Sequence, residues 1–380
     1  MIPRDTLYKL GPMLMDDDIS EWPWQTGPGA EHILKRQWEL ADLLSSRSPI
    51  FLDTNFWVMA RQAAFEEMDD LELISLLGAL RLAVESGKFF FPITSDLIAE
   101  FSKQSPERLA RTMMLVDRLS LGVAMAPHHE RTAIEMERFS AWVLPDYPPA
   151  PRPLWTCYAF ALGYEDMRPS GIQVDDALLV ALAEKAWMSP PSLLAQMVPP
   201  ETFAARLDSE RIAAFLNEQE ALHAHEIDSH DTALRIEVAG AASMLTGIAA
   251  REYRRMAAAA GHTREADGVE NSVGVGRRVT GMIAEALEKD EHRRAFGSLY
   301  VPAMLHAAVR SEANRRIKPN DIFDFRHAAA ALPYCRAFLT DGPLRSLITS
   351  GHVRLDRLYD CEIAATPAEA IDLIGRLALG

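Results

Sequence analysis

Cysteine is scarce in this chain of 380 residues, which contains three of them: Cys157, Cys335 and Cys361. Three scattered cysteines cannot form a disulfide framework, and the sequence has no Cys-x-x-Cys pair that would indicate a zinc site. A small secreted protein held together by disulfides is therefore excluded. We expect a protein of the reducing cytoplasm.

Long apolar runs are also missing. No window reaches the roughly 18 uncharged apolar residues that a membrane-spanning helix needs. Arg4 and Lys9 stand near the N-terminus, but the later stretch MLMDDDISEWPW contains three successive aspartates and does not fit a signal peptide. The sequence predicts no membrane span, no secretory leader and no membrane partner.

Basic residues are fewer than acidic ones, and the formal net charge is −15 at pH 7. This balance argues against a protein that binds nucleic acid by bulk attraction to its phosphates. Residues 251–320 differ from the rest, with 13 Lys and Arg against 9 Asp and Glu. Basic pairs there, such as Arg254–Arg255, form either solvated helix faces or one local nucleic-acid contact. The candidates for that contact are Arg315, Arg316 and Lys318.

Apolar patterning predicts alternating helices and strands in the first third of the chain. Residues 31–47 have helical spacing and end in SSRSP, which leads into the apolar strand IFLDTN. The same order repeats with a helix over 69–86, Gly87 as its stop, and a strand over 89–93. Two further elements follow, a helix over 106–119 and a strand over 121–127. Alternation of this kind favours a parallel sheet covered by helices.

The middle of the chain has a different character. The stretch WVLPDYPPAPRPLW has five prolines in 14 residues, which excludes a helix interior or a central strand and predicts a linker. From about 155 to 310 the sequence has helical periodicity and no clear strand. A helix over 320–331, the strand AFLTD, and a last strand and helix in YDCEIAATPAEAIDLIGRL then return to the earlier pattern.

The chain is therefore expected to be one α/β domain, a parallel sheet flanked by helices, interrupted by a mainly α-helical insertion. Four segments follow from this division. They are an N-terminal extension over 1–30, the first part of the α/β domain over 31–140, the helical insertion over 141–300, and the second part of the α/β domain over 301–380.

Acidic residues stand at the ends of the predicted strands. Asp53 and Asp341 each follow an apolar strand, and parallel α/β sheets bind their ligands at these strand ends. Glu100 and Asp324 each lie in the first turns of a predicted helix. Any one of these carboxylates alone also fits a helix cap or a solvated helix face. Because the four come from separate junctions of strand and helix, we expect them to converge at one edge of the sheet.

Carboxylates that converge repel one another, and their pKa values rise unless a cation compensates. Oxygen ligands without cysteine suit Mg²⁺ or Mn²⁺, held by a few carboxylates together with water. Such a cation activates water and neutralises the charge that develops on a phosphodiester during in-line displacement. The sequence therefore predicts metal-dependent hydrolysis of phosphate esters.

Four acidic motifs resemble those of PIN-domain nucleases: IFLDTNFW, FPITSDLIAEF, DIFDFRHAAAA and AFLTD. The resemblance covers about half of the chain, within residues 31–140 and 300–380. It implies a PIN-like fold and an acidic metal site, in which Thr54 and Asn55 orient the first aspartate by hydrogen bonding and Thr340 acts similarly at the fourth position. The metal-binding residues that it implies are Asp53, Glu100, Asp324 and Asp341.

The chain departs from the family pattern in three ways. The gap between Glu100 and Asp324 is much longer than a compact domain needs, because the helical block lies within it. Asp321 stands one helical turn before Asp324 on the same face, so either or both are candidates for the third ligand. Asp341 follows Thr340 directly, where many members have one more residue between them. We favour Asp324, because the helix and strand after it have the family's length.

We expect a metal-dependent nuclease of the PIN type that acts on RNA, and the choice of RNA comes from the resemblance alone. His327, one turn after Asp324, is a candidate either for a phosphate contact or for a core or capping role. A toxin with a protein regulator, a processing enzyme and a homodimer all fit the resemblance. The alternatives are a catalytically inactive PIN-like protein for binding or assembly, and a DNA-directed nuclease or phosphatase that uses the same acids.

Overall fold

The computed structural model describes residues 27–66, 69–143, 152–163, 175–197, 209–259, 261, 269–312 and 315–379. Most of the predicted N-terminal extension lies outside these residues, and so does the greater part of the five-proline linker. The acidic motifs all lie inside them.

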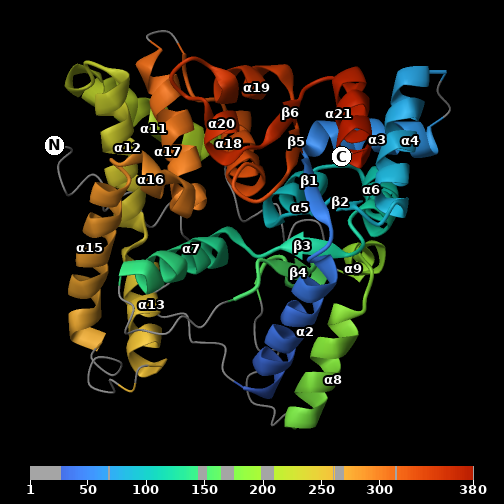
Figure 1. Cartoon of the computed structure of the whole chain (residues 1–380), viewed down its shortest axis with the longest axis horizontal. Coiled ribbons are helices and arrows are strands. Elements are labelled where there is room, and N and C mark those ends of the chain that lie inside the picture. The colour runs from blue at the N-terminus through green and yellow to red at the C-terminus, as the bar shows by residue number, and fades with distance from the viewer. Residues whose placement is uncertain are drawn as a thin grey trace.

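A four-stranded parallel sheet forms the centre of the α/β part (Figure 1). Its strands are β1 (Ser48–Leu52), β2 (Phe89–Phe90), β5 (Ala337–Leu339) and β6 (Glu362–Ala364), in the spatial order β2-β1-β5-β6. Ile50 and Leu52 of β1 pair with Ala337 and Leu339 of β5, and all four are fully buried. Burial of this kind is typical of a parallel sheet covered by helices. The predicted α/β class, with a parallel sheet flanked by helices, is confirmed.

A second pair of strands lies beside β2. The predicted strand over 121–127 is β3 (Val123–Met125), which pairs antiparallel with β4 (Trp155–Cys157) and reaches the main sheet through one parallel bridge, Ile93 to Ala124. The expectation of no strand between 155 and 310 is therefore wrong at β4. A strand of three residues is too short to show a period in the sequence, and it forms here because the edge of β3 is available to it.

The helices of the α/β part begin and end where local signals place them. Asp70 caps α4 (Leu71–Glu85), and Gly87 follows this helix with a φ of 72°, a conformation that favours glycine. Thr94 caps α5 (Ser95–Phe101). The other helices of this part are α2 (Pro28–Leu44), α3 (Thr54–Phe65), α6 (Pro106–Leu119), α7 (His128–Val143), α18 (Pro319–Ala331), α19 (Gly342–Thr349), α20 (Leu355–Tyr359) and α21 (Pro367–Leu379).

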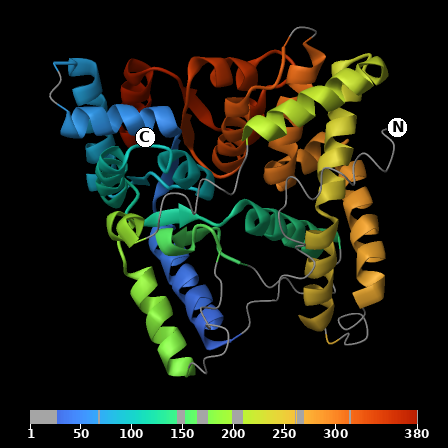
Figure 2. The ribbon, with the colours of Figure 1, turned by 180° about the vertical axis from the view of Figure 1, so that it is seen from behind.

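The middle of the chain is mainly helical, as predicted. Its described helices are α8 (Asp176–Trp187), α9 (Pro191–Met197), α11 (Ser209–His223), α12 (His230–Met244), α13 (Thr246–Ala259), α15 (Val269–Ala286), α16 (Asp290–Arg293) and α17 (Gly297–Ser311). α12 packs against α17, and α13 against α15. α8 lies beside α2, and the two extend together away from the sheet (Figure 2).

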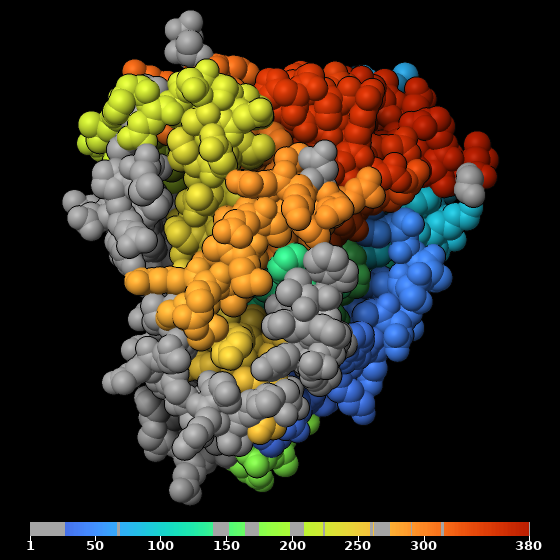
Figure 3. All heavy atoms as spheres, turned by 60° about the vertical axis from the view of Figure 1, so that its left-hand side comes forward, coloured from blue at the N-terminus to red at the C-terminus, as the bar shows by residue number. Residues whose placement is uncertain are grey.

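The helical middle shares a core with the sheet. One cluster of buried apolar residues runs from Phe51 and Phe338 of the strands to Ile248 of α13 and Ile283 of α15. Figure 3 shows the yellow and orange atoms of the middle segment directly against the red atoms of the C-terminal segment. The division of the chain at residues 141 and 301 stays a prediction.

All three cysteines are buried and free. Among the described residues, no single helix has both the length and the apolar composition to cross a bilayer. The bent pair α12 and α13 meets both conditions only when its two helices are taken together.

Candidate active site

The first and fourth acidic residues stand at neighbouring strand ends. Asp53 follows β1 and caps α3, and its Oδ1 accepts hydrogen bonds from the backbone amides of Asn55 at 3.0 Å and Phe56 at 3.2 Å. Asp341 follows β5 and caps α19, and its Oδ1 accepts one from the amide of Leu344 at 2.8 Å. Because β1 and β5 are adjacent and parallel, both carboxylates lie at one edge of the sheet.

Asp324, in the second turn of α18, joins these two carboxylates. The pKa of Asp324 is raised to about 8, first by burial and then by the negative charges of Asp341, Asp53 and Glu100, with Asp321 contributing least. Three of these four neighbours come from other elements of the fold. The charges of the other three acidic motifs therefore all act on Asp324, and a shared site of the four acids stays a prediction.

Asp321 has a different role in the structure. Its Oδ2 accepts a hydrogen bond from the backbone amide of Lys318 at 2.9 Å, which makes it part of a capping box at the start of α18. This bond leaves Asp324 as the better candidate for the third ligand, with Asp321 one turn away.

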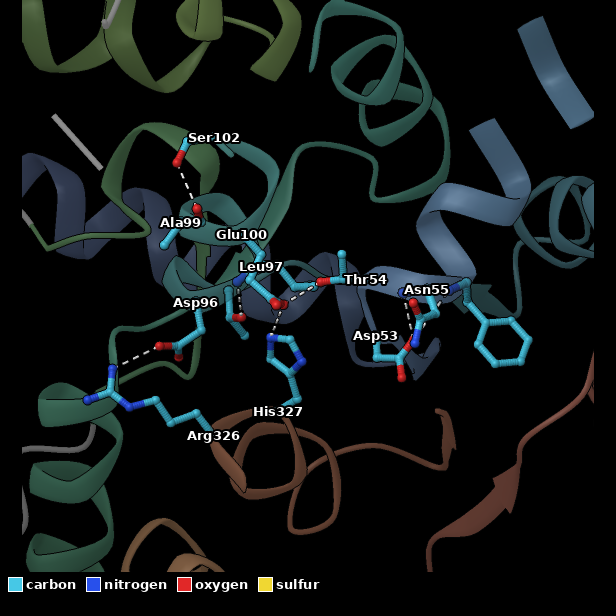
Figure 4. Close-up of polar contacts among 12 residues, drawn as sticks. Asp53, Thr54, Asn55, Asp96, Leu97, Ala99, Glu100, Ser102, Arg326 and His327 are labelled. Atoms are coloured by element: carbon cyan, nitrogen blue, oxygen red, sulfur yellow. Dashed lines mark hydrogen bonds and ion pairs between the residues drawn. The ribbon is translucent and has the colours of Figure 1, made fainter. Parts of the chain in front are cut away.

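Glu100 is held by two other side chains (Figure 4). It lies in the last turn of the short helix α5, and its Oε2 accepts a hydrogen bond from the hydroxyl of Thr54. Nε2 of His327 lies 3.3 Å from the same oxygen. His327 is only 1% exposed, so it supports Glu100 from within the protein. Thr54 was expected to orient Asp53; the hydroxyl reaches Glu100 instead, and Asn55 holds Asp53 through its backbone amide.

Asp53 is the most enclosed of the four acids. It is 5% exposed, and burial raises its pKa to about 6, against the opposing effects of the Thr340 hydroxyl and of His327. Thr340 was expected to serve the fourth position, yet its hydroxyl lies beside Asp53. Among the described residues this hydroxyl is fully buried without an aligned hydrogen-bond partner, and buried polar groups of this kind are exceptional in proteins.

The donor set of the site fits a hydrated divalent cation. The candidate donors are all carboxylate oxygens, and after burial their mutual repulsion contributes to the raised pKa of Asp324. Within the described part of the chain, no group of three or more His, Cys, Asp or Glu side chains is arranged to hold a metal ion. By type alone, carboxylate oxygens are the donors that Mg²⁺ and Mn²⁺ prefer.

The predicted basic contact lies just before α18. Arg315 is 3.7 Å from Glu312, whereas Arg316 and Lys318 are exposed. Other basic residues of the 251–320 segment are used inside the protein: Arg255 pairs with Glu137 and Glu252, and Arg293 donates to two backbone carbonyls. The arginine pairs of this segment therefore do not all contribute to one solvent-facing basic surface.

An ion pair beside the site was missed in the sequence. Arg326 donates from Nη1 to Oδ1 of Asp96 at 3.0 Å, next to the contact of His327 with Glu100 (Figure 4). Arg326, more than its neighbour His327, holds the pKa of Asp96 below its usual range, although burial opposes this. The sequence did contain a signal for Asp96. It precedes Glu100 by one helical turn, so the two side chains are neighbours on the same helix.

Comparison of the chain with protein-family models, with curated proteins and with solved structures finds no match. The function is therefore inferred from the geometry of the acidic site and from the four motifs that form it.

Proposed function

We propose that this protein is a PIN-like, Mg²⁺- or Mn²⁺-dependent nuclease that hydrolyses phosphodiester bonds, with RNA as the expected substrate. One observation supports the proposal above the others. Burial, and after it the negative charges of Asp341, Asp53 and Glu100 from three other elements of the fold, raise the pKa of Asp324 to about 8.

Capping roles for the single aspartates leave the repulsion among the four acids uncompensated. Bringing like charges together destabilises the folded protein unless a cation or protons neutralise them. The residues that would hold the cation are Asp53, Glu100, Asp324 and Asp341. When bound, a divalent cation supplies charge neutralisation for the phosphate and activation of water.

The chain itself supplies fixed positions for these acids. Two backbone amides at the start of α3 hold Asp53, and one amide of α19 holds Asp341. Thr54 holds Glu100 by a hydrogen bond to Oε2, and Nε2 of His327 lies beside the same oxygen without an aligned hydrogen bond. Preorganised groups of this kind lower the reorganisation needed when a substrate binds. Asp324 and Asp341 are partly exposed, so solvent reaches both carboxyl groups.

The direct test uses purified protein, a 5′-labelled single-stranded RNA, and Mg²⁺ or Mn²⁺. We expect cleavage by the wild type and a loss of at least 100-fold for Asp324→Asn and Asp341→Asn. Cation binding is measured separately as the rise in Tm on adding Mn²⁺, which we expect in the wild type and not in Asp324→Asn. Equal cleavage by all three proteins, or none by any of them, would refute the nuclease.

A second candidate is a catalytically inactive PIN-like protein for binding or assembly. The helix-capping bonds of Asp53 and Asp341 favour it, since these bonds give both aspartates a structural role without a metal. The same experiment separates the two candidates, because an assembly protein leaves RNA intact at every cation concentration. Parallel assays with single-stranded DNA and with a phosphate monoester test the DNA-directed nuclease and the phosphatase.

A further inference from the structure

Helix α8 has apolar side chains on two of its faces. On one face Ala183 is buried in a small apolar cluster with Ile33 of α2, and Leu179 is buried as well. On the other face Leu178 and Leu182 are exposed. A surface helix of a globular protein usually has a single apolar stripe and a polar opposite face. The second apolar face of α8 therefore has no partner within the described residues.

This exposed face continues from α8 onto α9. Ala181, Lys185 and Met188 of α8 line a shallow hollow of about 530 Å³ together with Leu193 of α9. In both views of the ribbon α8 lies at the outer edge of the molecule, with no described helix or strand beyond it (Figures 1 and 2). Contiguous exposed apolar side chains of this kind mark interaction sites. Those of this face are between 39% and 71% exposed: Leu178, Leu182, Met188, Leu193 and Met197.

The charge of this face changes sign along α8. Asp175, the N-cap, is exposed, and so is Lys185 near the other end. Helical spacing places both on the side of Leu178. Glu184 is already bound by His32 and Arg36 of α2, whereas no ion pair holds Lys185 among the described residues. The face is therefore negative at one end and positive at the other.

We propose that this face of α8 and α9 binds a second copy of the chain, with the two α8 helices antiparallel about a twofold axis beside Ala181 and Leu182. This inference goes beyond the proposed nuclease function and does not depend on it. The surface lies in the middle of the chain, outside the four acidic motifs.

A twofold axis requires a surface that is complementary to itself, and this face meets the requirement in shape. About the proposed axis, Leu182 of each copy lies against the small side chain of Ala181 of the other. Leu178 of each copy then lies against the stem of Lys185, at the hollow. Projecting leucines of one half of α8 thus meet the hollowed half of its copy.

The charges select the antiparallel orientation and the second copy. In this orientation Asp175 of each copy lies one helical turn from the position opposite Lys185, within reach of its long side chain. A parallel arrangement would instead bring the two Lys185 side chains together, which is unfavourable. An unrelated apolar segment would match the leucines but gains nothing from the change of sign. A second copy uses both.

The position of α8 keeps the acidic residues free in such a dimer. α2, against which α8 packs, ends before β1 begins, whereas Asp53 follows the end of β1. The face therefore lies toward the opposite edge of the sheet from the acids (Figure 1). Because each copy contributes the same patch, the buried area counts twice toward the roughly 1,200–2,000 Å² of a specific interface.

The test measures the mass of the full-length protein by sedimentation equilibrium from about 1 to 200 μM. We expect the wild type to be a dimer that dissociates in the micromolar range. Leu182→Glu and Met188→Glu should raise the dissociation constant at least 30-fold, because each would bury an unpaired charge. Leu82→Glu on α4 and Met282→Glu on α15 are matched controls, since both residues are exposed to a similar degree. Neither should change the dissociation constant.

A charge reversal tests the orientation. Lys185→Glu should raise the dissociation constant about tenfold, because it faces Asp175 of the other copy. Adding Asp175→Asn to Lys185→Glu should recover most of this loss, since asparagine removes the repulsion and still caps the helix. A general loss of stability gives no such recovery.

A cross-link tests the position of the axis. Leu182→Cys should give a covalent dimer with a short bismaleimide, whereas Leu82→Cys should not. The three native cysteines are buried and contribute little background. A wild type that stays monomeric to 200 μM, or a dimer that Leu182→Glu and Met188→Glu leave intact, overturns the inference. Absence of both the charge recovery and the cross-link overturns it as well, and none of these results bears on RNA cleavage.

Discussion

The hydroxyl of Thr54 donates its hydrogen bond to Glu100, 46 residues further along the chain. This bond links the first turn of α3 to the last turn of α5, and so it joins two of the four acidic motifs. The carboxylate of Glu100 is fixed by a residue of the first motif, and the neighbouring Asp53 is fixed by backbone amides. The orientation of Glu100, in the second motif, therefore depends on Thr54 of the first motif.

Replacing Thr54 with Val should weaken catalysis without unfolding the protein. The hydroxyl that orients Glu100 is lost while the side-chain volume is kept, and losing a hydrogen bond that orients a metal ligand reduces metal affinity or activity by about 10- to 100-fold. Steady-state cleavage of RNA measures the effect. Thr54→Ser, which keeps the hydroxyl, is the control and should retain most of the activity. An unchanged rate in Thr54→Val would show that Glu100 needs no such support.

Asp324→Asn should make the metal-free protein more stable and the site inactive. Burial and the charges of three other carboxylates raise the pKa of Asp324 to about 8, so at pH 7 the folded protein must take up a proton there; asparagine needs none, which stabilises the variant by about 1 kcal/mol in a partly exposed site. Urea unfolding with EDTA present measures this gain. Asp360→Asn, at an exposed aspartate away from the site, should not show it. A metal-free Asp324→Asn protein less stable than the wild type would contradict the convergence of the four acids.

Glu135 should make the stability of the protein depend on pH. It lies on α7, accepts hydrogen bonds from Tyr334 and from the amide of Ser298, and burial raises its pKa from 4.5 to about 7. Between pH 4.5 and about 7, the folded protein therefore keeps a proton on Glu135 that the unfolded chain has released. The stabilisation is full below pH 4.5 and is lost as the pH rises to 7, by about 1 to 3 kcal/mol.

Urea unfolding at pH 5 and pH 8 tests this linkage. Other raised carboxyl groups contribute a slope of the same sign, so the comparison is between the wild type and Glu135→Gln. We expect the variant to lose less stability between the two pH values. Identical losses in the two proteins would mean that Glu135 is ionised throughout.

Gly297 should not tolerate a side chain. It is the first residue of α17, and a Cβ atom there would lie 2.2 Å from Cγ of Pro333, in the loop after α18. Gly297→Ala must push the two helices apart, and overpacking of this degree costs about 1–3 kcal/mol. Gly281→Ala is the control, because a Cβ there meets nothing within 4 Å and alanine favours the helix. Equal stability of the two variants would show that the contact yields easily.

Local signals were sufficient for most of the α/β part. Gly87 was expected to mark the end of one helix, and it does so in the structure. The strand ends bearing Asp53 and Asp341 were also found, because an apolar run followed by an acid is visible without knowledge of the fold.

What the sequence did not show depends on partners far along the chain. β4 is a strand because β3 lies next to it. The hydroxyls of Thr54 and Thr340 each reach a different acid from the one expected. A side chain's direction within its own element does not identify which distant residue will be near it. The ion pair of Asp96 with Arg326 joins residues 230 positions apart, and the sequence did not show it for the same reason.

The pairing of β1 with β5 has a consequence for folding during synthesis on the ribosome. The backbone amide of Asp53 bonds to the carbonyl of Leu339, so the two strands that carry Asp53 and Asp341 join only after almost the whole chain has been translated. Contacts of such long sequence separation form late and slowly. Until then the acids are far apart, and a nascent chain carries no assembled acidic site.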